Sequence, residues 1–390
     1  MIITLSTLIM KMRKIYLAMA AVVAFGSVFT SCSDDDEPKW NDEGSEITLP
    51  ESRMYILNEG SMSQNNASIS FYNPGEGEPK FVADIFFDQN GGRLGDTGQS
   101  MIKYGKNIYV AVYGSNYMVK LNTACVKEGE VSFSKDPELQ GGVRYIAAED
   151  GYIYASFYGG IVAKINASTL DVEKKLKTPG ANLEGVAIEN DYLYVANSYE
   201  RTTDPETGKN KYNYFKDVFV IDLNTFTLKE TLVVEQNPNM LIEEDDKVFL
   251  ISWNYSRESY VLQMIDPDAN NKVTELVYAT NMAAGNDMLY LVDSRTDYSV
   301  RPYVTTNTFS SYDIKSRRLN TTSFLKDAPA ELATSSIYMM TVSEYTGDIY
   351  IGVTNYSASN GTMYRFKQDG SFVGKFDCGG QNPRAAVFFN

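Results

Sequence analysis

The side chains that could do chemistry in this sequence recur at one place in a repeat, about ten residues before an aromatic motif. Each of these positions holds a polar residue: Gln99, Arg144, Glu184, Asn239, Thr280, Tyr338 and Arg384. Their amide, guanidinium, carboxylate and hydroxyl groups donate or accept hydrogen bonds. The set places no nucleophile beside a base, so it indicates recognition of a polar ligand. The alternative interpretation is a water-lined channel that binds no ligand.

A second group of candidates comes from segments rich in aromatic residues, mainly 199–215, 253–260, 294–307 and 355–361. Aromatic rings held on a rigid scaffold supply a large contact area at small entropic cost. We therefore expect ligand contacts also from Tyr113, Tyr117, Tyr158, Tyr199, Trp253, Tyr255, Arg295, Tyr298 and Asn355.

The composition excludes several classes of protein. The 390 residues include no histidine, so histidine-dependent triads and histidine-ligated zinc are ruled out. The net charge of −15 argues against a nucleic-acid partner, because phosphate neutralisation needs a basic surface. Glu184 and Glu200 could form a carboxylate pair of the glycosidase kind. Acidic residues are so common here that such a pair is weak evidence for glycosidase chemistry. We expect a binding protein and no enzyme.

The elements that must position these residues are short strands in a sevenfold repeat. An aromatic residue flanked by aliphatic ones recurs at 54–57, 108–110, 153–155, 193–195, 248–250, 289–291 and 349–351. Turn residues precede each motif, and two further strand-like runs follow it. Four strands per unit, at a spacing of 40 to 60 residues, predict an all-β fold, a seven-bladed β-propeller.

The two ends of the repeat predict how the ring closes. The first unit lacks a strand before its motif, whereas residues 382–389 form a surplus strand at the C-terminus. That strand, which begins Asn382-Pro383, matches Asn237-Pro238 in the fifth unit. We expect the C-terminal strand to complete the first blade and to leave no open sheet edge. An open solenoid or two sandwiches are the alternatives.

Residues 1–31 are expected to be an export signal, with Lys11, Arg13 and Lys14 preceding an apolar stretch. The tract 28–32 resembles a bacterial lipoprotein cleavage box, which makes Cys32 the lipidated residue. Residues 32–52, with their acidic run, are then a tether, and 53–390 the propeller. A signal peptide cut without lipidation is the alternative.

Other signals are weaker. Asp-rich turns could hold Ca²⁺, although no calcium-loop spacing is present, and no other cofactor is expected. Cys125 and Cys378 could pair only if the fold brings them together.

The segments Asn58-Glu59-Gly60, 65–69 and Tyr158-Gly159-Gly160, together with the seven motifs, resemble the YncE-like propellers of Bacteroides surface lipoproteins. The resemblance implies an outer-membrane lipoprotein that faces the cell exterior. It also implies capture of cobalamin (vitamin B12) and its delivery to a TonB-dependent outer-membrane transporter. The alternative is a propeller that binds a glycan or a protein at the cell surface.

Overall fold

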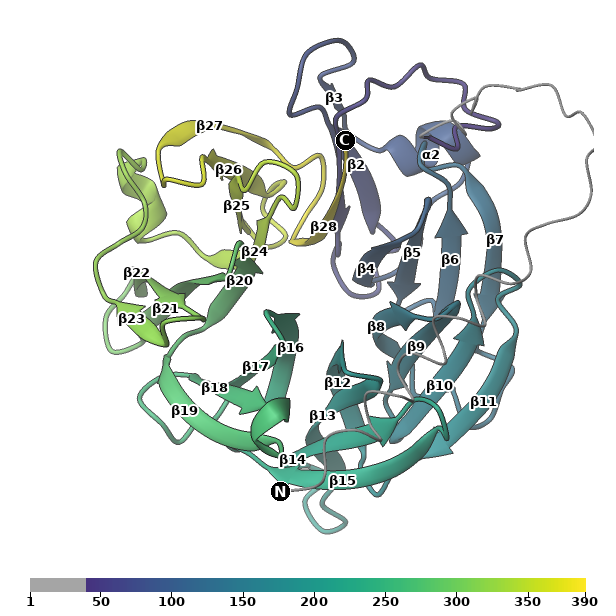
Figure 1. Cartoon of the computed structure of the whole chain (residues 1–390), viewed down its shortest axis with the longest axis vertical. Coiled ribbons are helices and arrows are strands. Elements are labelled where there is room, and N and C mark those ends of the chain that lie inside the picture. Colours follow the sequence, from purple (N-terminus) through teal and green to yellow (C-terminus); the bar gives the residue numbers. More distant parts are fainter. Residues whose placement is uncertain (1–39) are drawn as a thin grey trace, which may run out of the picture. The chain divides into compact units, whose positions relative to one another are not determined.

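The computed structural model describes residues 40–390, and Trp40–Asn390 forms one compact unit. Seven four-stranded antiparallel sheets are arranged in a ring (Figure 1). The first blade has the strand order β28-β1-β2-β3, and the other six blades each consist of four consecutive strands. The predicted fold class, an all-β propeller of seven blades, is confirmed.

Each blade has four strands, which we name a to d from the ring centre outward. The a strands are β28 (Pro383–Phe389), β4 (Gly98–Tyr104), β8 (Val143–Glu149), β12 (Asn182–Glu189), β16 (Pro238–Glu244), β20 (Asn281–Gly285) and β24 (Ile337–Val342). The b strands are β1 (Arg53–Asn58), β5 (Asn107–Val112), β9 (Tyr152–Phe157), β13 (Tyr192–Thr203), β17 (Lys247–Ser252), β21 (Met288–Asp297) and β25 (Ile349–Val353).

The outer strands follow in the same order. The c strands are β2 (Ser68–Tyr72), β6 (Tyr117–Leu121), β10 (Ile161–Asn166), β14 (Asn210–Asp222), β18 (Val261–Asp266), β22 (Val304–Asp313) and β26 (Thr362–Phe366). The d strands are β3 (Phe81–Val82), β7 (Lys127–Ser132), β11 (Val172–Lys177), β15 (Thr227–Val233), β19 (Lys272–Tyr278), β23 (Arg318–Asn320) and β27 (Phe372–Asp377). Helical turns lie between blades or strands: α2 (Ile85–Asn90), η1 (Pro267–Ala269) and η2 (Ala330–Ala333).

The seven aromatic motifs all lie in the b strands, where their aliphatic residues are buried between neighbouring blades. Several central tyrosines also link one blade to the next. Tyr109 donates to the carbonyl of Ala167 (2.7 Å), and Tyr194 donates to the Asn271 side chain (2.7 Å). Burial raises the pKa of Tyr109 to about 12, so its hydroxyl remains a donor. The repeated tyrosine therefore fills the core and satisfies a turn of the adjacent blade.

The turns between strands a and b explain the Asp/Asn-rich spacing of the sequence. In the turn Asn190-Asp191, φ is 52° and 64°; in Asp245-Asp246 it is 51° and 58°. Two central residues with positive φ match the twist of the strands they join, and Asn, Asp and Gly tolerate this conformation best. These turns, with the connections between strands c and d, form what we call the turn face.

The C-terminal strand closes the ring as predicted. β28 pairs antiparallel with β1, with Val387 opposite Tyr55 and Phe389 opposite Arg53. Phe389 packs edge-on against Tyr55, with ring centroids 6.1 Å apart. The last strand of the chain therefore holds the first blade in place (Figure 1).

The opposite side, which we call the loop face, carries the connections between strands b and c and between blades. Two of its aromatic segments differ from the loops that the sequence predicted. Strands β13 and β14 continue as a paired hairpin as far as Thr203 and Asn210, and β21 and β22 as far as Asp297 and Val304. Tyr199, Tyr212 and Tyr214 are therefore held by sheet hydrogen bonds, whereas Tyr298 and Tyr303 lie in the loop 298–303 that connects β21 and β22.

Residues 40–52, expected within the tether, pack against the turn face. Arg53 is 1% exposed and forms a salt bridge with Asp42 (2.6 Å). Thr123 donates from its backbone nitrogen to the Asn41 carbonyl (3.1 Å), and the Trp40 ring lies edge-on to Phe389 at 6.1 Å. Among the described residues, no helix is long and apolar enough to cross a membrane.

Candidate functional site

The polar residues of the a strands lie where those strands begin, at the loop face. Gln99, Asn239, Tyr338 and Arg384 are the unpaired residues at irregularities in the pairing of strands a and b. Arg144 and Glu184 occupy similar positions in β8 and β12. An extra residue at a β-bulge redirects its side chain. The bulges thus recur in blade after blade at the sequence positions that carry the candidate polar groups.

Three residues of this set, Gln99, Arg144 and Glu184, are joined by a buried ion pair and a hydrogen bond. Arg144 bonds to Glu184 through Nε and Nη2 (2.9 and 2.8 Å) and donates from Nη1 to the Gln99 side chain (2.7 Å). Its guanidinium also lies 4.6 Å from the ring centroids of both Tyr113 and Tyr158. Burial opposes the charge of Arg144, but Glu184 and nearby tyrosines outweigh it and raise the pKa.

Glu184 is 2% exposed and accepts from Tyr158 as well as from Arg144. Burial, followed by the negative charge of Glu184, raises the pKa of Tyr158 well above its ordinary value. Both carboxylate oxygens of Glu184 are thus occupied by donors. Glu200, the other residue of the possible catalytic pair, is exposed on β13. This arrangement holds an aromatic surface in place and assigns neither carboxylate an acid or base role.

Two further residues of the set, Tyr338 and Arg384, form a second cluster with Tyr145 and Glu59. Its Nη2 donates to the Tyr145 hydroxyl, and its Nε lies 3.8 Å from a carboxylate oxygen of Glu59. Tyr338 donates to the same carboxylate (2.7 Å). Burial lowers the pKa of Arg384, while Tyr145, Glu59 and Tyr338 raise it to a value above the ordinary one. These contacts account for Tyr338 and Arg384 as a second charged cluster.

A pocket of about 400 Å³, the tyrosine pocket, lies between the Arg144–Glu184 pair and the hairpin β13–β14. Blades three to five supply its lining: Arg144, Tyr158, Glu184, Ser198, Tyr199, Tyr212, Tyr214, Asn237, Asn239, Trp253 and Tyr255. Tyr158 and Tyr199 pack edge-on at 6.1 Å, and Tyr212 and Tyr214 are stacked at 6.3 Å.

Two polar atoms of the tyrosine pocket are buried without a partner in the protein, the amide oxygen of Asn239 and the indole nitrogen of Trp253. Asn239 is 3% exposed. A buried polar group that makes no hydrogen bond costs free energy, which a matching ligand group can recover. Both atoms belong to residues that line the pocket, so its wall contains one unpaired acceptor and one unpaired donor among aromatic side chains.

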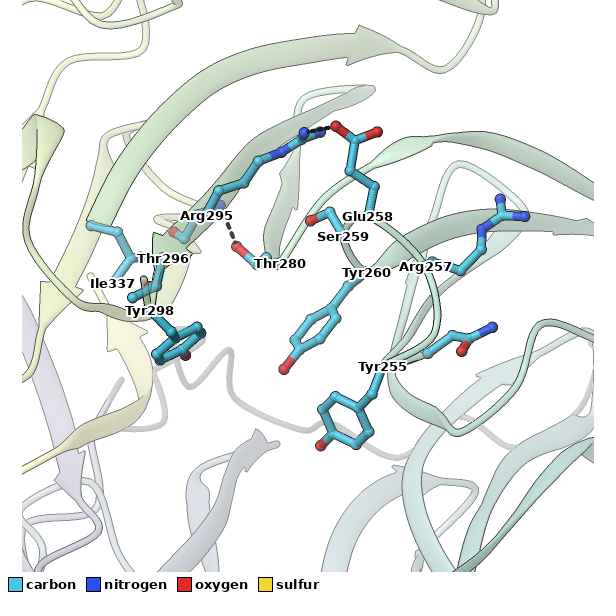
Figure 2. Close-up of a pocket in the computed structure, with 12 residues that line it drawn as sticks. Tyr255, Arg257, Glu258, Ser259, Tyr260, Thr280, Arg295, Thr296, Tyr298 and Ile337 are labelled. Atoms are coloured by element: carbon cyan, nitrogen blue, oxygen red, sulfur yellow. Dashed lines mark hydrogen bonds and ion pairs between the residues drawn. The ribbon is translucent and has the colours of Figure 1, made fainter. Parts of the chain in front are cut away.

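A second pocket of about 450 Å³, the hydroxyl pocket, lies between blades five, six and seven. It is lined by Asn254, Tyr255, Arg257, Glu258, Ser259, Tyr260, Thr280, Ser294, Arg295, Thr296, Tyr298 and Ile337. Figure 2 shows Tyr255 and Tyr260 across from Tyr298, with Arg295 joined to Glu258. Tyr255 lines both pockets and is 60% exposed.

The structure thus brings together ten of the expected residues at the two pockets: Arg144, Tyr158, Glu184, Tyr199, Asn239, Trp253, Tyr255, Thr280, Arg295 and Tyr298. Gln99 and Tyr113 contact Arg144 without lining either pocket. Tyr117 lies elsewhere: it packs against a hydrophobic cluster, and its hydroxyl donates to the Leu94 carbonyl. Asn355 is exposed and bonds to the Asn360 carbonyl (2.7 Å) within its own loop.

Two further expectations concern cysteines and metals. Cys125 and Cys378 are both buried free thiols, so the fold does not pair them. Cys32 lies outside the described residues. Across residues 40–390, no group of three or more acidic or cysteine side chains is placed to hold a metal ion.

The sequence interpretation missed several residues of the site, notably Tyr212, Tyr214 and Asn237. Asn237 accepts from Ser198 (2.5 Å) and donates to the Trp253 carbonyl (3.0 Å). It therefore holds the main chain of Trp253 in place. The Asn-Pro pair that predicted ring closure was the signal for it. Tyr212 and Tyr214 alternate in the sequence, as neighbours on one face of a strand do.

These observations define the class: a seven-bladed β-propeller with two adjoining pockets on one face. A family model described as a domain of unknown function (DUF5074) matches residues 53–214. No curated protein sequence matches the chain significantly.

Solved structures share the fold. A quinonprotein alcohol dehydrogenase-like protein from Bacteroides thetaiotaomicron is 14% identical, with a TM-score of 0.59 over 87% of this chain and 78% of that one. A hypothetical selenium-binding protein from Sulfolobus tokodaii is 10% identical, with a TM-score of 0.57 over 88% and 94% of the two chains. Hydrazine synthase from Kuenenia stuttgartiensis is 13% identical, with a TM-score of 0.55 over 70% and 77%.

Proposed function

We propose that this protein is a binding protein that captures a corrinoid of the cobalamin class at the loop face. The observation that carries the proposal is the tyrosine pocket, where three blades place aromatic faces around a buried acceptor and a buried donor. A corrin ring is broad and edged by neutral amides, which can pair with Asn239 and Trp253 while the ring packs on tyrosine faces. The preformed sheet limits the entropy lost on binding.

The charges of the site favour a neutral ligand. Arg144 is paired with Glu184, and Arg384 lies beside Glu59, so each buried cation already has a carboxylate partner. With no histidine in the chain, no imidazole of the protein can replace the lower base of the ligand at cobalt. Capture therefore rests on surface contact and hydrogen bonds, with no bond from an imidazole of the protein to the metal.

Calorimetry with cyanocobalamin and the purified protein tests this proposal. We expect one-to-one binding that weakens at least tenfold in Tyr199→Ala, and by roughly three- to tenfold in Trp253→Phe, which loses one hydrogen bond. Tyr356→Ala is the matched control, because Tyr356 is 61% exposed and lines neither pocket. If no heat is released and the coloured ligand does not co-elute, cobalamin is not the ligand.

A glycan or a protein partner is the second candidate. The exposed rings of Tyr212 (46%) and Tyr298 (71%) favour it, since aromatic residues at a rim can stack on sugar rings or anchor an interface. A glycan array or a pull-down in the absence of corrinoid distinguishes this candidate.

We further propose that Cys32 carries a lipid that holds the protein on the outer face of the outer membrane. From there it would pass its ligand to a TonB-dependent transporter. The resemblance of 28–32 to a lipoprotein cleavage box supports the anchor. Cells fed a labelled fatty acid should label the wild-type protein and not Cys32→Ala; equal labelling of both would reject the anchor.

A further inference from the structure

The two pockets of the loop face adjoin each other and differ in chemistry. Their shared wall is Tyr255, whose ring packs edge-on against Tyr214 (5.7 Å) on the tyrosine-pocket side and against Tyr260 (6.1 Å) on the other. A ligand that covers Tyr255 therefore reaches both hollows.

The hydroxyl pocket is lined mainly by groups that bond to hydroxyls. Ser259, Thr280, Ser294 and Thr296 line it together with the pair Arg295–Glu258. The Ser294 Oγ atom is buried and has no partner in the protein. The other three aliphatic hydroxyls of this pocket are bonded within the protein, Ser259 to Asp293, Thr280 to the Val292 carbonyl and Thr296 to Thr305. The tyrosine pocket has one hydroxyl of this kind, on Ser198, which donates to Asn237.

The cations of the hydroxyl pocket are neutralised. Arg295 bonds to Asp293 (2.8 Å) and Glu258, and Arg257 to Glu275 (2.6 Å), with Glu235 at 3.7 Å. With at least as many carboxylates as guanidinium groups, this pocket does not favour a phosphate. Ion pairs do present fixed donors and acceptors side by side, which suits sugar hydroxyls because each of them both donates and accepts.

We infer that the site is bipartite: the tyrosine pocket takes the macrocycle of a corrinoid, and the hydroxyl pocket takes the sugar unit attached to it. This inference rests on the proposed function and adds a second recognition element to it. The protein then distinguishes a complete corrinoid, which carries a ribose, from one that lacks the nucleotide part.

Comparing cyanocobalamin with dicyanocobinamide, which lacks the phosphate, the ribose and the lower base, tests the inference together with variants of the hydroxyl pocket. We expect the intact protein to prefer cobalamin. Ser294→Ala removes a hydroxyl that has no partner in the protein, and Tyr298→Ala removes an exposed ring that packs edge-on against Tyr303. Each change should lower the cobalamin-to-cobinamide affinity ratio about three- to tenfold, the effect of one neutral hydrogen bond or ring contact. Tyr356→Ala should leave the ratio unchanged.

The outcomes separate the two proposals. If both corrinoids bind equally well, or if the two substitutions weaken both ligands equally, the bipartite site is wrong while corrinoid capture stands. If neither ligand binds, corrinoid capture itself is wrong and this inference falls with it. Circular dichroism of each variant confirms that a change in affinity does not reflect unfolding.

Discussion

At the scale of single residues, the Arg144–Glu184 pair organises the tyrosine pocket. Arg144 contacts two tyrosine rings and two side-chain acceptors, so its charge fixes the positions of groups from three blades. Burying such a pair costs desolvation free energy. Replacing one partner leaves an unpaired buried charge and destabilises the fold, whereas replacing both by apolar residues costs much less. We regard it as a positioning element beneath the ligand.

Glu184→Ala should therefore lower the free energy of unfolding by about 3–5 kcal/mol, because it leaves a buried guanidinium unpaired. The double variant Arg144→Met/Glu184→Leu should recover most of this loss in chemical denaturation, yet bind ligand weakly because Tyr158 loses its acceptor. A single Glu184→Ala variant as stable as the wild type would contradict this account.

A second residue-scale prediction concerns the turn face. Burial, followed by the charges of Glu189 and Glu244, raises the pKa of Glu243 to about 7. An acid whose pKa is raised by folding binds its proton more tightly in the folded state. Its stabilising contribution is present in full below about pH 4.5 and is lost as the pH rises through about 7.

Thermal melts of the wild type and Glu243→Gln at pH 5 and pH 8 test this. The substitution should reduce the loss of stability between the two pH values by at most about 1 kcal/mol, since solvent screens this partly exposed carboxylate. Lys247, near this cluster, opposes the repulsion. An unchanged difference between the two pH values would show that Glu243 does not titrate in this range.

At the scale of elements, ring closure depends on β28. Deleting residues 382–390 exposes the edge of β1 and removes Val387 and Phe389 from the core. We expect a cooperative loss of the whole fold, visible as loss of the thermal transition, because every blade relies on its neighbours. A truncated protein that melts at the wild-type temperature would contradict closure by this strand.

The elements also show what sequence reasoning could reach. The b strands were predictable because Tyr55, Tyr109 and their equivalents repeat between aliphatic residues, and the turns because Asn and Asp tolerate positive φ. The extensions of β13 and β21 were not, since their outer residues are polar and exposed and lack the alternation that marks a half-buried strand.

The same limit applied to the site. The bulge positions could be found because they precede each motif by a near-constant spacing. Which of them face a pocket depends on packing between blades, as Tyr117 illustrates: an aromatic residue near Tyr113 in sequence, it faces the core. Similarly, Tyr212 and Tyr214 reach Tyr199 only through the register of the hairpin.

At the scale of the whole molecule, the two faces differ in what they can do. The turn face has tight connections and clustered acidic residues such as Glu189, Glu243 and Asp246. The loop face has both pockets and most of the exposed tyrosines. The two pockets adjoin on one face of a ring that is closed by its own C-terminal strand.

The place where the chain joins the body has a mechanical consequence. Trp40 and Asn41 pack against Phe389 and Thr123 on the turn face, so a lipid attached upstream would tether the propeller from the side opposite its pockets. In that orientation, the pockets would open toward the medium, which favours ligand capture. Under the proposed function, a transporter embedded in the same membrane would lie on the anchored side of the propeller, so delivery would require the propeller to rotate about its tether. Tether length would then govern the rate of delivery without changing affinity.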